Sequence, residues 1–207
     1  MSKLIFVGGA TCSGKTTFCN CLSNHLENVT RYRRVQGFFD LAKKRGIEAS
    51  EAYSKISPSD VDNNFIEKVL DNDILVSDVH YAIQMTRNQF VDSALESIYD
   101  QYVGTISSDL IDKLLDAGVE VYALHISCSP DMCFERAIKR FNDKQRELRS
   151  KNALDAELEN VAERREWNAL CENSSIKQIE LCSDSATPEQ LVEEFIKILE
   201  KKYVLKR

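Results

Sequence analysis

A glycine-rich segment near the start of the chain has the residue types and the spacing of a phosphate-binding loop. Residues 4–20 read LIFVGGATCSGKTTFCN, in which Gly9, Gly14, Lys15 and Thr16 satisfy the pattern G-x-x-x-x-G-K-[ST]. Glycines let the backbone turn successive N–H groups toward an anion, and a following helix N-terminus favours negative charge. An apolar run precedes the motif and an amphipathic pattern follows it, a context that an accidental glycine-rich turn would lack. We therefore predict that this segment binds the phosphates of a nucleoside triphosphate.

Two oxygen-bearing residues are candidates for holding Mg²⁺ beside those phosphates. In such loops the lysine, here Lys15, lies over the β- and γ-phosphates, and the hydroxyl of the next residue, Thr16, ligates the ion. The apolar segment 73–78 ends in a carboxylate, Asp78, which suits the second metal-holding element. The alternative is that Asp78 caps a helix beginning at Tyr81. The expected nucleotide contacts are the loop residues Gly9, Ala10, Thr11, Cys12, Ser13, Gly14, Lys15, Thr16 and Thr17.

Arginines farther along the chain could act on the same phosphates. Arg136 and Arg140 lie four residues apart, so they share one face of a predicted helix. They could contact a nucleotide, or they could form a solvated basic stripe paired with Glu135 or Asp143. The residues alone leave both interpretations open.

A charged segment at about 141–152 is poor in apolar residues, and we expect a cationic lid there. Its positive side chains are Lys144, Arg146, Arg149 and Lys151. In the next predicted helix, Arg164 could reach the transferred phosphoryl group, or it could form a surface ion pair. His80, two residues after Asp78, could contact the substrate or serve only in packing.

The composition narrows the class of protein. The chain has 207 residues, of which 43% are hydrophobic and 29% charged, and its formal net charge is −6. A protein that grips nucleic acid electrostatically is usually basic, so a nucleic-acid partner is disfavoured. No apolar stretch approaches the roughly 20 residues that span a membrane. The seven cysteines are odd in number and include no C-x-x-C pair, which favours reduced thiols and a cytoplasmic location.

Strand-like and helix-like segments alternate along the chain, which predicts a single α/β domain with a parallel sheet and helices on both faces. Strands are expected at 4–7, 29–35, 73–78, 119–126 and 176–182. Helices are expected at 15–26, 38–45, 58–71, over most of 81–117, and at 130–144, 154–170 and from 188 onward, the last opened by a capping box. Ligands of such sheets bind at the carboxyl ends of the strands. The residues expected there are Gly8, Gly9, Gln36, Gly37, Asp78, Ser127 and Ser183.

Three segments together resemble the nucleoside monophosphate kinase group of phosphate-loop kinases. They are the phosphate loop, the LVSD strand that ends at Asp78, and the sequence SPDMCFERAIKR at 129–140. The sequence is most similar to the archaeal type of adenylate kinase, which also carries Asp-x-His after its third strand, as Asp78 and His80 do here. The resemblance covers nearly the whole chain, and the phosphate loop is its most specific part.

The resemblance implies a five-stranded parallel sheet of the phosphate-loop kinase fold, an insertion at about 36–70 that binds a nucleoside monophosphate, and a lid at about 141–152. By the match, Arg136 would flank the donor adenine and Arg140 would contact phosphates. The loop Ser183–Ala186, including Ser185, would hold the adenine base. The cofactors implied are ATP and Mg²⁺.

The sequence departs from this family where AMP would bind. Common adenylate kinases have one arginine in the first insertion helix and another just after the metal-binding acid. Residues 38–42 and 79–83 contain none. Arg87, or a cation from among Lys43, Lys44 and Arg45, would have to replace them.

The leading hypothesis from the sequence is an ATP- and Mg²⁺-dependent enzyme that transfers the γ-phosphoryl group to a small acceptor, expected to be a nucleotide. Lys15, Asp78, Arg140 and Arg164 are its candidate catalytic residues. Two rivals remain. One is an ATP-binding switch that hydrolyses slowly and acts on a partner protein, and the other is a kinase of another metabolite or of nucleic-acid ends.

Overall fold

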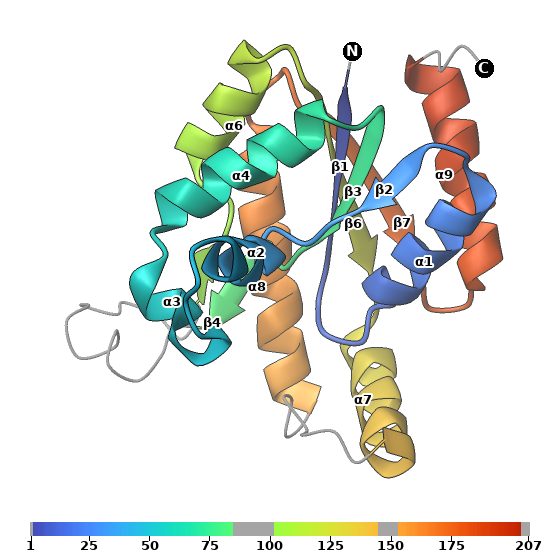
Figure 1. Cartoon of the computed structure of the whole chain (residues 1–207). Helices are drawn as coiled ribbons and strands as arrows, with labels where there is room; N and C mark the ends of the chain where they lie inside the picture. The colour runs from blue at the N-terminus through green and yellow to red at the C-terminus, as the bar shows by residue number, and fades with distance from the viewer. Residues whose placement is uncertain (1, 85–101, 145–152, 204–207) are drawn as a thin grey trace.

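A five-stranded parallel sheet forms the centre of the molecule, in the order β2-β3-β1-β6-β7. The computed structural model describes residues 2–84, 102–144 and 153–203 (Figure 1). The strands are β1 (Lys3–Gly8), β2 (Val29–Arg31), β3 (Ile74–Asp78), β6 (Glu120–Ser127) and β7 (Lys177–Cys182). Register places Val7 of β1 opposite Asp78 of β3. The end of β3 therefore lies directly beside the start of the phosphate loop.

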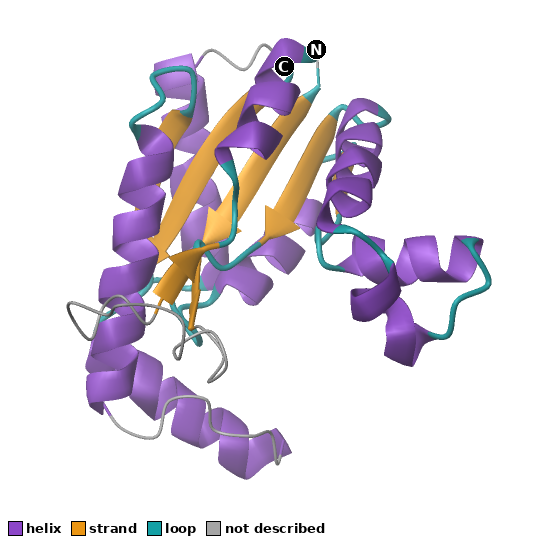
Figure 2. Cartoon of the chain, turned by 90° about the vertical axis from the view of Figure 1, so that its left-hand side faces the viewer, coloured by secondary structure: helices purple, strands orange, loops and turns teal. Residues whose placement is uncertain are grey.

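Helices cover both faces of this sheet, as the alternation in the sequence predicts (Figure 2). One face packs against α4 (Pro58–Leu70), α6 (Ser108–Asp116) and α8 (Ala153–Cys171), and the other against α1 (Lys15–His25) and α9 (Pro188–Tyr203). The side chains of β1 alternate between the two cores, because successive strand residues point to opposite faces. Leu4 and Phe6 lie in the first core, and Ile5 and Val7 lie in the second. No helix in the described ranges is long and apolar enough to cross a membrane.

Two helix starts form as their sequences predict. Ser57 accepts a hydrogen bond from the Asp60 amide at 3.1 Å, and Pro58 occupies the first helical position of α4. At α9 the capping box is reciprocal. The Thr187 amide donates to the Gln190 side chain at 2.8 Å, and the Gln190 amide donates to the Thr187 hydroxyl at 3.3 Å. These caps fix the directions in which the two helices leave their loops.

Smaller elements gather at the carboxyl edge of the sheet, the lower edge in Figure 1. After β2 come α2 (Gln36–Lys44), a 3₁₀ turn (Ala49–Glu51) and α3 (Ala52–Lys55). Together with the first turn of α4 they enclose a small apolar cluster of Leu41, Ala42, Ala52, Ile56 and Val61. Later turns of α4 contribute Phe65 and Val69 to the main core instead. Helix α7 (Pro130–Lys144) extends below the sheet on the other side of the loop.

The expected second strand is wrong in its length. Strand pairing ends at Arg31, not at residue 35, and Gln36 and Gly37 begin α2 where the sequence predicted a break at the end of a strand. A turn closes just after the strand, since the Gln36 amide donates to the Arg33 carbonyl at 2.9 Å. The residues at the carboxyl end of this strand are therefore arginines.

The expected helix over most of 81–117 is also wrong in its first part. Residues Ala82–Gln84 (β4) and Tyr102–Gly104 (β5) form a small antiparallel pair, and only α6 is helical among the described residues of that stretch. The Tyr81 hydroxyl lies within hydrogen-bond distance of the carbonyls of Phe6 (3.2 Å) and Leu124 (3.0 Å), which anchors this residue against β1 and β6. Residues 85–101, including Arg87, lie outside the described part, as do residues 145–152 of the expected lid.

One buried histidine makes the stability of this fold depend on pH. His125 in β6 is 1% exposed, and its ring stacks on Trp167 with centroids 5.0 Å apart. Neither of its ring nitrogens has a hydrogen-bond partner among the described residues. Burial first, and then the charge of Arg164, lower the pKa of His125 to about 4.

We expect the free energy of unfolding to fall as the pH drops from about 6.5 toward 4. In that window the unfolded chain protonates His125 and the folded chain does not, so this residue removes up to about 1.4 kcal/mol per pH unit. Urea unfolding at several pH values should show a shallower loss for His125→Phe than for the wild type. The exposed His25 supplies the matched control, His25→Phe, which should keep the wild-type slope. Equal slopes for all three proteins would contradict the assignment.

Candidate active site

The phosphate loop lies between β1 and α1, as its motif predicts, and its geometry depends on two glycines. Gly9 and Gly14 have φ angles of 137° and 100°, in the region that favours glycine. A Cβ atom on Gly9 would lie 2.3 Å from the carbonyl oxygen of Ile126. The Ser13 amide closes the loop by donating to the Ala10 carbonyl at 3.1 Å. Both the turn and its close approach to β6 therefore require the motif glycines.

Lys15 lies folded over this loop. Its side chain is buried, and its ammonium group donates to the carbonyls of Gly9 and Ala10, the latter at 2.8 Å. A buried ammonium needs such partners, because an unpaired charge out of water is costly. The cation is thus held at the mouth of the loop, where the terminal phosphates of a bound nucleotide would lie.

Thr16 and Asp78 meet beside the loop, as predicted for a metal site. The Thr16 hydroxyl donates to the Asp78 carboxylate at 2.7 Å, and the Asp78 side chain is only 5% exposed. Burial alone would raise the pKa of the Asp78 carboxyl, but hydrogen bonds from Thr16 and Arg33 and the charge of Lys15 outweigh it and hold that pKa below its usual value. An ionised carboxylate next to a hydroxyl is a donor set that Mg²⁺ prefers. These two side chains fit the ion that the motif implies.

Two arginines that the sequence analysis missed bind the same carboxylate. Arg31 and Arg33 lie 3.2 Å and 2.8 Å from the Asp78 oxygen, and Arg34, next in the chain, pairs with Asp62 of α4. The signal was present as the sequence RYRR at 31–34, but it was assigned to the interior of a longer strand. These arginines lie at the end of β2 and just before α2, beside Asp78.

Arg136 joins the loop to the segment after β7, where the adenine base was expected. Its guanidinium donates to the Ser183 hydroxyl (3.1 Å) and carbonyl (2.6 Å), and the Ser183 hydroxyl donates to the Ser13 carbonyl at 2.7 Å. Ser185 is exposed two residues farther along. Arg136 is therefore linked to the segment after β7, and nucleotide-binding roles for Arg136 and Ser185 stay predictions.

The structure does not bring Arg140 and Arg164 to the phosphate loop. Arg140 is exposed on α7, and Arg164 pairs with Glu180 of β7. Within the described ranges, neither guanidinium is hydrogen-bonded to Asp78 or to the loop. A catalytic role for either arginine stays a prediction, and it requires the side chain to change its position.

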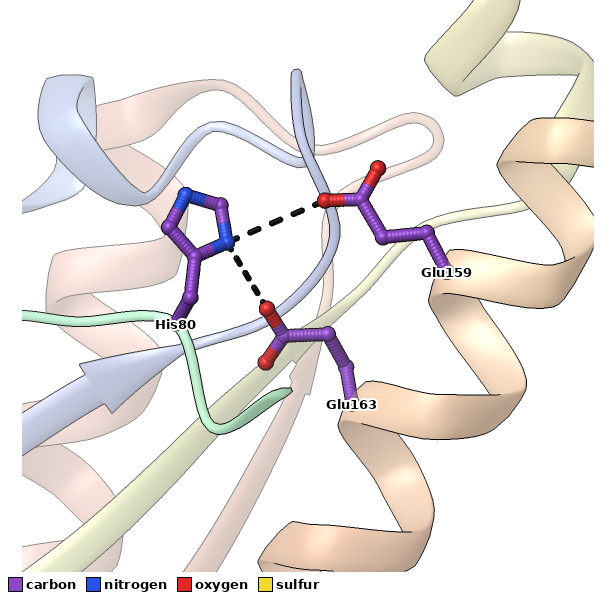
Figure 3. A group of neighbouring side chains, drawn as sticks. All are labelled: His80, Glu159 and Glu163. Atoms are coloured by element: carbon purple, nitrogen blue, oxygen red, sulfur yellow. Dashed lines mark hydrogen bonds and ion pairs between the residues drawn. The ribbon is translucent and has the colours of Figure 1, made fainter. Parts of the chain in front are cut away.

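Two carboxylates from α8 accept hydrogen bonds from the phosphate loop, and the sequence analysis missed them as well. Glu163 accepts hydrogen bonds from the amides of Gly9 (3.3 Å) and Tyr81 (2.7 Å). Glu159 accepts from the Thr11 amide (2.8 Å) and from the Thr11 hydroxyl (2.7 Å). The His80 Nδ1 faces both carboxylates, so this residue does neighbour the site (Figure 3). The available signal was the four-residue spacing, which puts both glutamates on one helix face.

We expect Asp78→Asn to abolish most of the effect of Mg²⁺ on ATP binding. The amide keeps the size of the side chain and can still accept from Thr16, but it lacks the charge that attracts the ion. Titration calorimetry with ATP should show Mg²⁺ strengthening binding to the wild type, and this gain should shrink by about tenfold or more in the variant, or at least 1.4 kcal/mol. Asp73→Asn, at the exposed amino end of the same strand, is the control. An unchanged Mg²⁺ effect in Asp78→Asn would refute the metal assignment.

Three solved structures show the fold that surrounds this geometry. Shikimate kinase from Acinetobacter baumannii, solved in complex with shikimate, is 11% identical with a TM-score of 0.54, and the match covers 98% of this chain and 95% of that one. Shikimate kinase from Bacteroides thetaiotaomicron is 13% identical with a TM-score of 0.50, covering 97% and 99%. A tunicamycin resistance protein from Deinococcus radiodurans is 12% identical with a TM-score of 0.52, covering 96% of each chain. Such low identities establish the fold alone.

The sequence itself is assigned by a family model. No curated protein is similar enough to count as a relative. A model described as an AAA domain matches residues 5–161, which include the phosphate loop, Asp78 and all of α7. Since that match spans well over half of the 207 residues, and since the parallel sheet has the predicted phosphate-loop kinase fold, the chain belongs to this AAA-domain family and has the architecture of a phosphate-loop kinase.

Proposed function

We propose that the protein is an ATP- and Mg²⁺-dependent phosphotransferase that moves the γ-phosphoryl group to a small acceptor. The observation that carries the proposal is the contact between Thr16 and Asp78 next to a phosphate loop whose lysine is in place. Thr16 and Asp78 would hold Mg²⁺ there, and the ion would supply positive charge to the phosphates during transfer. All seven cysteines are free thiols, which suits the reducing cytoplasm, and we place the enzyme there.

The chain's own contribution is positioning and charge. Backbone N–H groups of the loop would bind the phosphate oxygens, Lys15 would neutralise the terminal phosphates, and Arg136 would hold the base side of the site. Phosphoryl transfer by this route needs no nucleophilic side chain, because the acceptor supplies the attacking oxygen. Arg140 and the lid would close over the nucleotide in the same proposal.

The acceptor that we favour is a nucleoside monophosphate, as in adenylate kinase. The support is the position of Arg31 and Arg33, which supply two cations on the acceptor side where the family's usual arginines are missing. When a metal ion neutralises Asp78, these guanidiniums lose their partner and become available to a phosphate group. A small anionic metabolite is the alternative acceptor, and the fold shared with a shikimate kinase solved in complex with shikimate supports it.

We expect purified protein with ATP and Mg²⁺ to phosphorylate at least one member of a panel of nucleoside monophosphates and small anionic metabolites. Product formation should be followed by ³¹P NMR or by thin-layer separation of labelled phosphate. Lys15→Ala should lower the rate by about 10²–10³-fold, because it removes a preorganised cation at the transferring group. Nucleotide hydrolysis without transfer to any acceptor would favour the switch hypothesis and contradict the kinase proposal.

A separate variant tests the acceptor assignment. Arg33→Ala should raise KM for the acceptor by about tenfold or more, since a charge-assisted bond to phosphate is worth about 1.5–3 kcal/mol, while KM for ATP stays near the wild-type value. Lys113→Ala is the control, because Lys113 forms an exposed ion pair with Asp109 on α6. An equal rise in both KM values, or no rise at all, would place Arg33 outside the acceptor site.

A further inference from the structure

Three ligand-bearing side chains converge beside the phosphate loop, apart from the Thr16–Asp78 pair. They are His80, on the segment after β3, and Glu159 and Glu163, one turn apart on α8. One ligand atom from each residue lies within 4.8 Å of the others. The His80 Nδ1 is 2.8 Å from Glu163 and 3.7 Å from Glu159. Figure 3 shows the imidazole and the two carboxylates directed toward one another.

The surrounding structure holds these side chains in fixed positions. Glu163 is fully buried, and its other oxygen, Oε2, accepts from the backbone amides of Gly9 and Tyr81, so its Oε1 faces His80. Glu159 is held by the amide and hydroxyl of Thr11. The backbone of His80 is fixed by the Thr105 hydroxyl, which donates to its carbonyl. A preorganised set of ligands is what a metal site requires.

The negative charge of the two α8 carboxylates would oppose the binding of phosphate groups by the loop. Glu159 and Glu163 bring two carboxylates against the amides of Thr11 and Gly9, in a loop that is built to bind a polyphosphate. Carboxylates and phosphate oxygens repel one another strongly in a partly buried site. Lys15 is a single cation, and Mg²⁺ on Asp78 would lie beside Thr16. A cation between the α8 carboxylates and the terminal phosphate would turn this repulsion into attraction.

We propose that His80, Glu159 and Glu163 bind a divalent transition-metal ion, at a second cation site distinct from the Mg²⁺ site of Thr16 and Asp78. An imidazole with two carboxylates suits Mn²⁺, Co²⁺ or Zn²⁺, whereas the all-oxygen pair of Thr16 and Asp78 suits Mg²⁺. On binding, the Nδ1 atom exchanges its contact with Glu163 for a bond to the metal through its lone pair, and the imidazole proton is carried by Nε2. The second oxygen of Glu159 can take over the hydrogen bond from the Thr11 hydroxyl.

Co²⁺ is the probe for this site, because its visible absorption reports coordination by nitrogen and oxygen. Titration of the nucleotide-free, full-length protein with Co²⁺, in the presence of millimolar Mg²⁺, should give a band that saturates at one equivalent. His80→Ala and Glu159→Gln should each weaken binding by at least about tenfold, as expected when a metal ligand is lost. Glu157→Gln, an exposed glutamate on the same helix, should bind as the wild type does.

Two further measurements separate this proposal from its rivals. Asp78→Asn should keep the cobalt band, so the result does not depend on the kinase assignment, and no nucleotide is present in the assay. Thermal unfolding without metal should show that Glu159→Gln remains folded, and added Co²⁺ should raise Tm for the wild type more than for this variant. The proposal would be overturned if the wild-type protein gave no band, or if His80→Ala and Glu159→Gln bound Co²⁺ as tightly as the wild type. The three residues would then form only a hydrogen-bonded structural cluster.

Discussion

The register between β1 and β3 is the constraint on which the site depends. It sets Val7 opposite Asp78, so that a carboxylate leaves the sheet at the same level as the phosphate loop. The Thr16 hydroxyl, in the first turn of α1, then reaches this carboxylate without any long side chain in between. A shift of one residue in either strand would direct Asp78 to the other face of the sheet, because strand side chains alternate. The contact between Thr16 and Asp78 is therefore a direct product of strand pairing.

Two groups of charged residues surround the phosphate loop. Arg31 and Arg33 neutralise Asp78 from the β2 side, and Glu159 and Glu163 engage the loop amides from α8. Both arrangements satisfy buried charge within the folded chain. The same contacts that stabilise the protein thus set the electrostatic conditions under which a nucleotide binds.

The features that could be predicted from the sequence are those encoded locally. The loop motif and the caps of α4 and α9 depend on residues close together in the chain, and they formed as expected. The alternation of strands and helices also formed, except where β4 and β5 replace an expected helix and where β2 is shorter than expected. Asp78 was named as a candidate metal ligand because it is an acid at the end of an apolar strand in a chain that also has a phosphate loop.

The missed features depend on contacts between distant parts of the chain. Glu163 reaches Gly9 across 154 residues, and Arg33 reaches Asp78 across 45. The extended segment after Tyr81 is fixed by carbonyls of β1 and β6, which no local pattern records. Helical periodicity in α8 correctly indicated a helix, but it could not show which of its faces meets the loop.

The account is tested most directly by a crystal structure of the protein with a non-hydrolysable ATP analogue and Mg²⁺. We expect the β- and γ-phosphates on the amides of the loop, one ion bound to both Thr16 and Asp78, and Arg31 and Arg33 withdrawn from that carboxylate. An analogue bound elsewhere, or a loop filled with phosphate while Asp78 keeps both arginines and holds no ion, would contradict it.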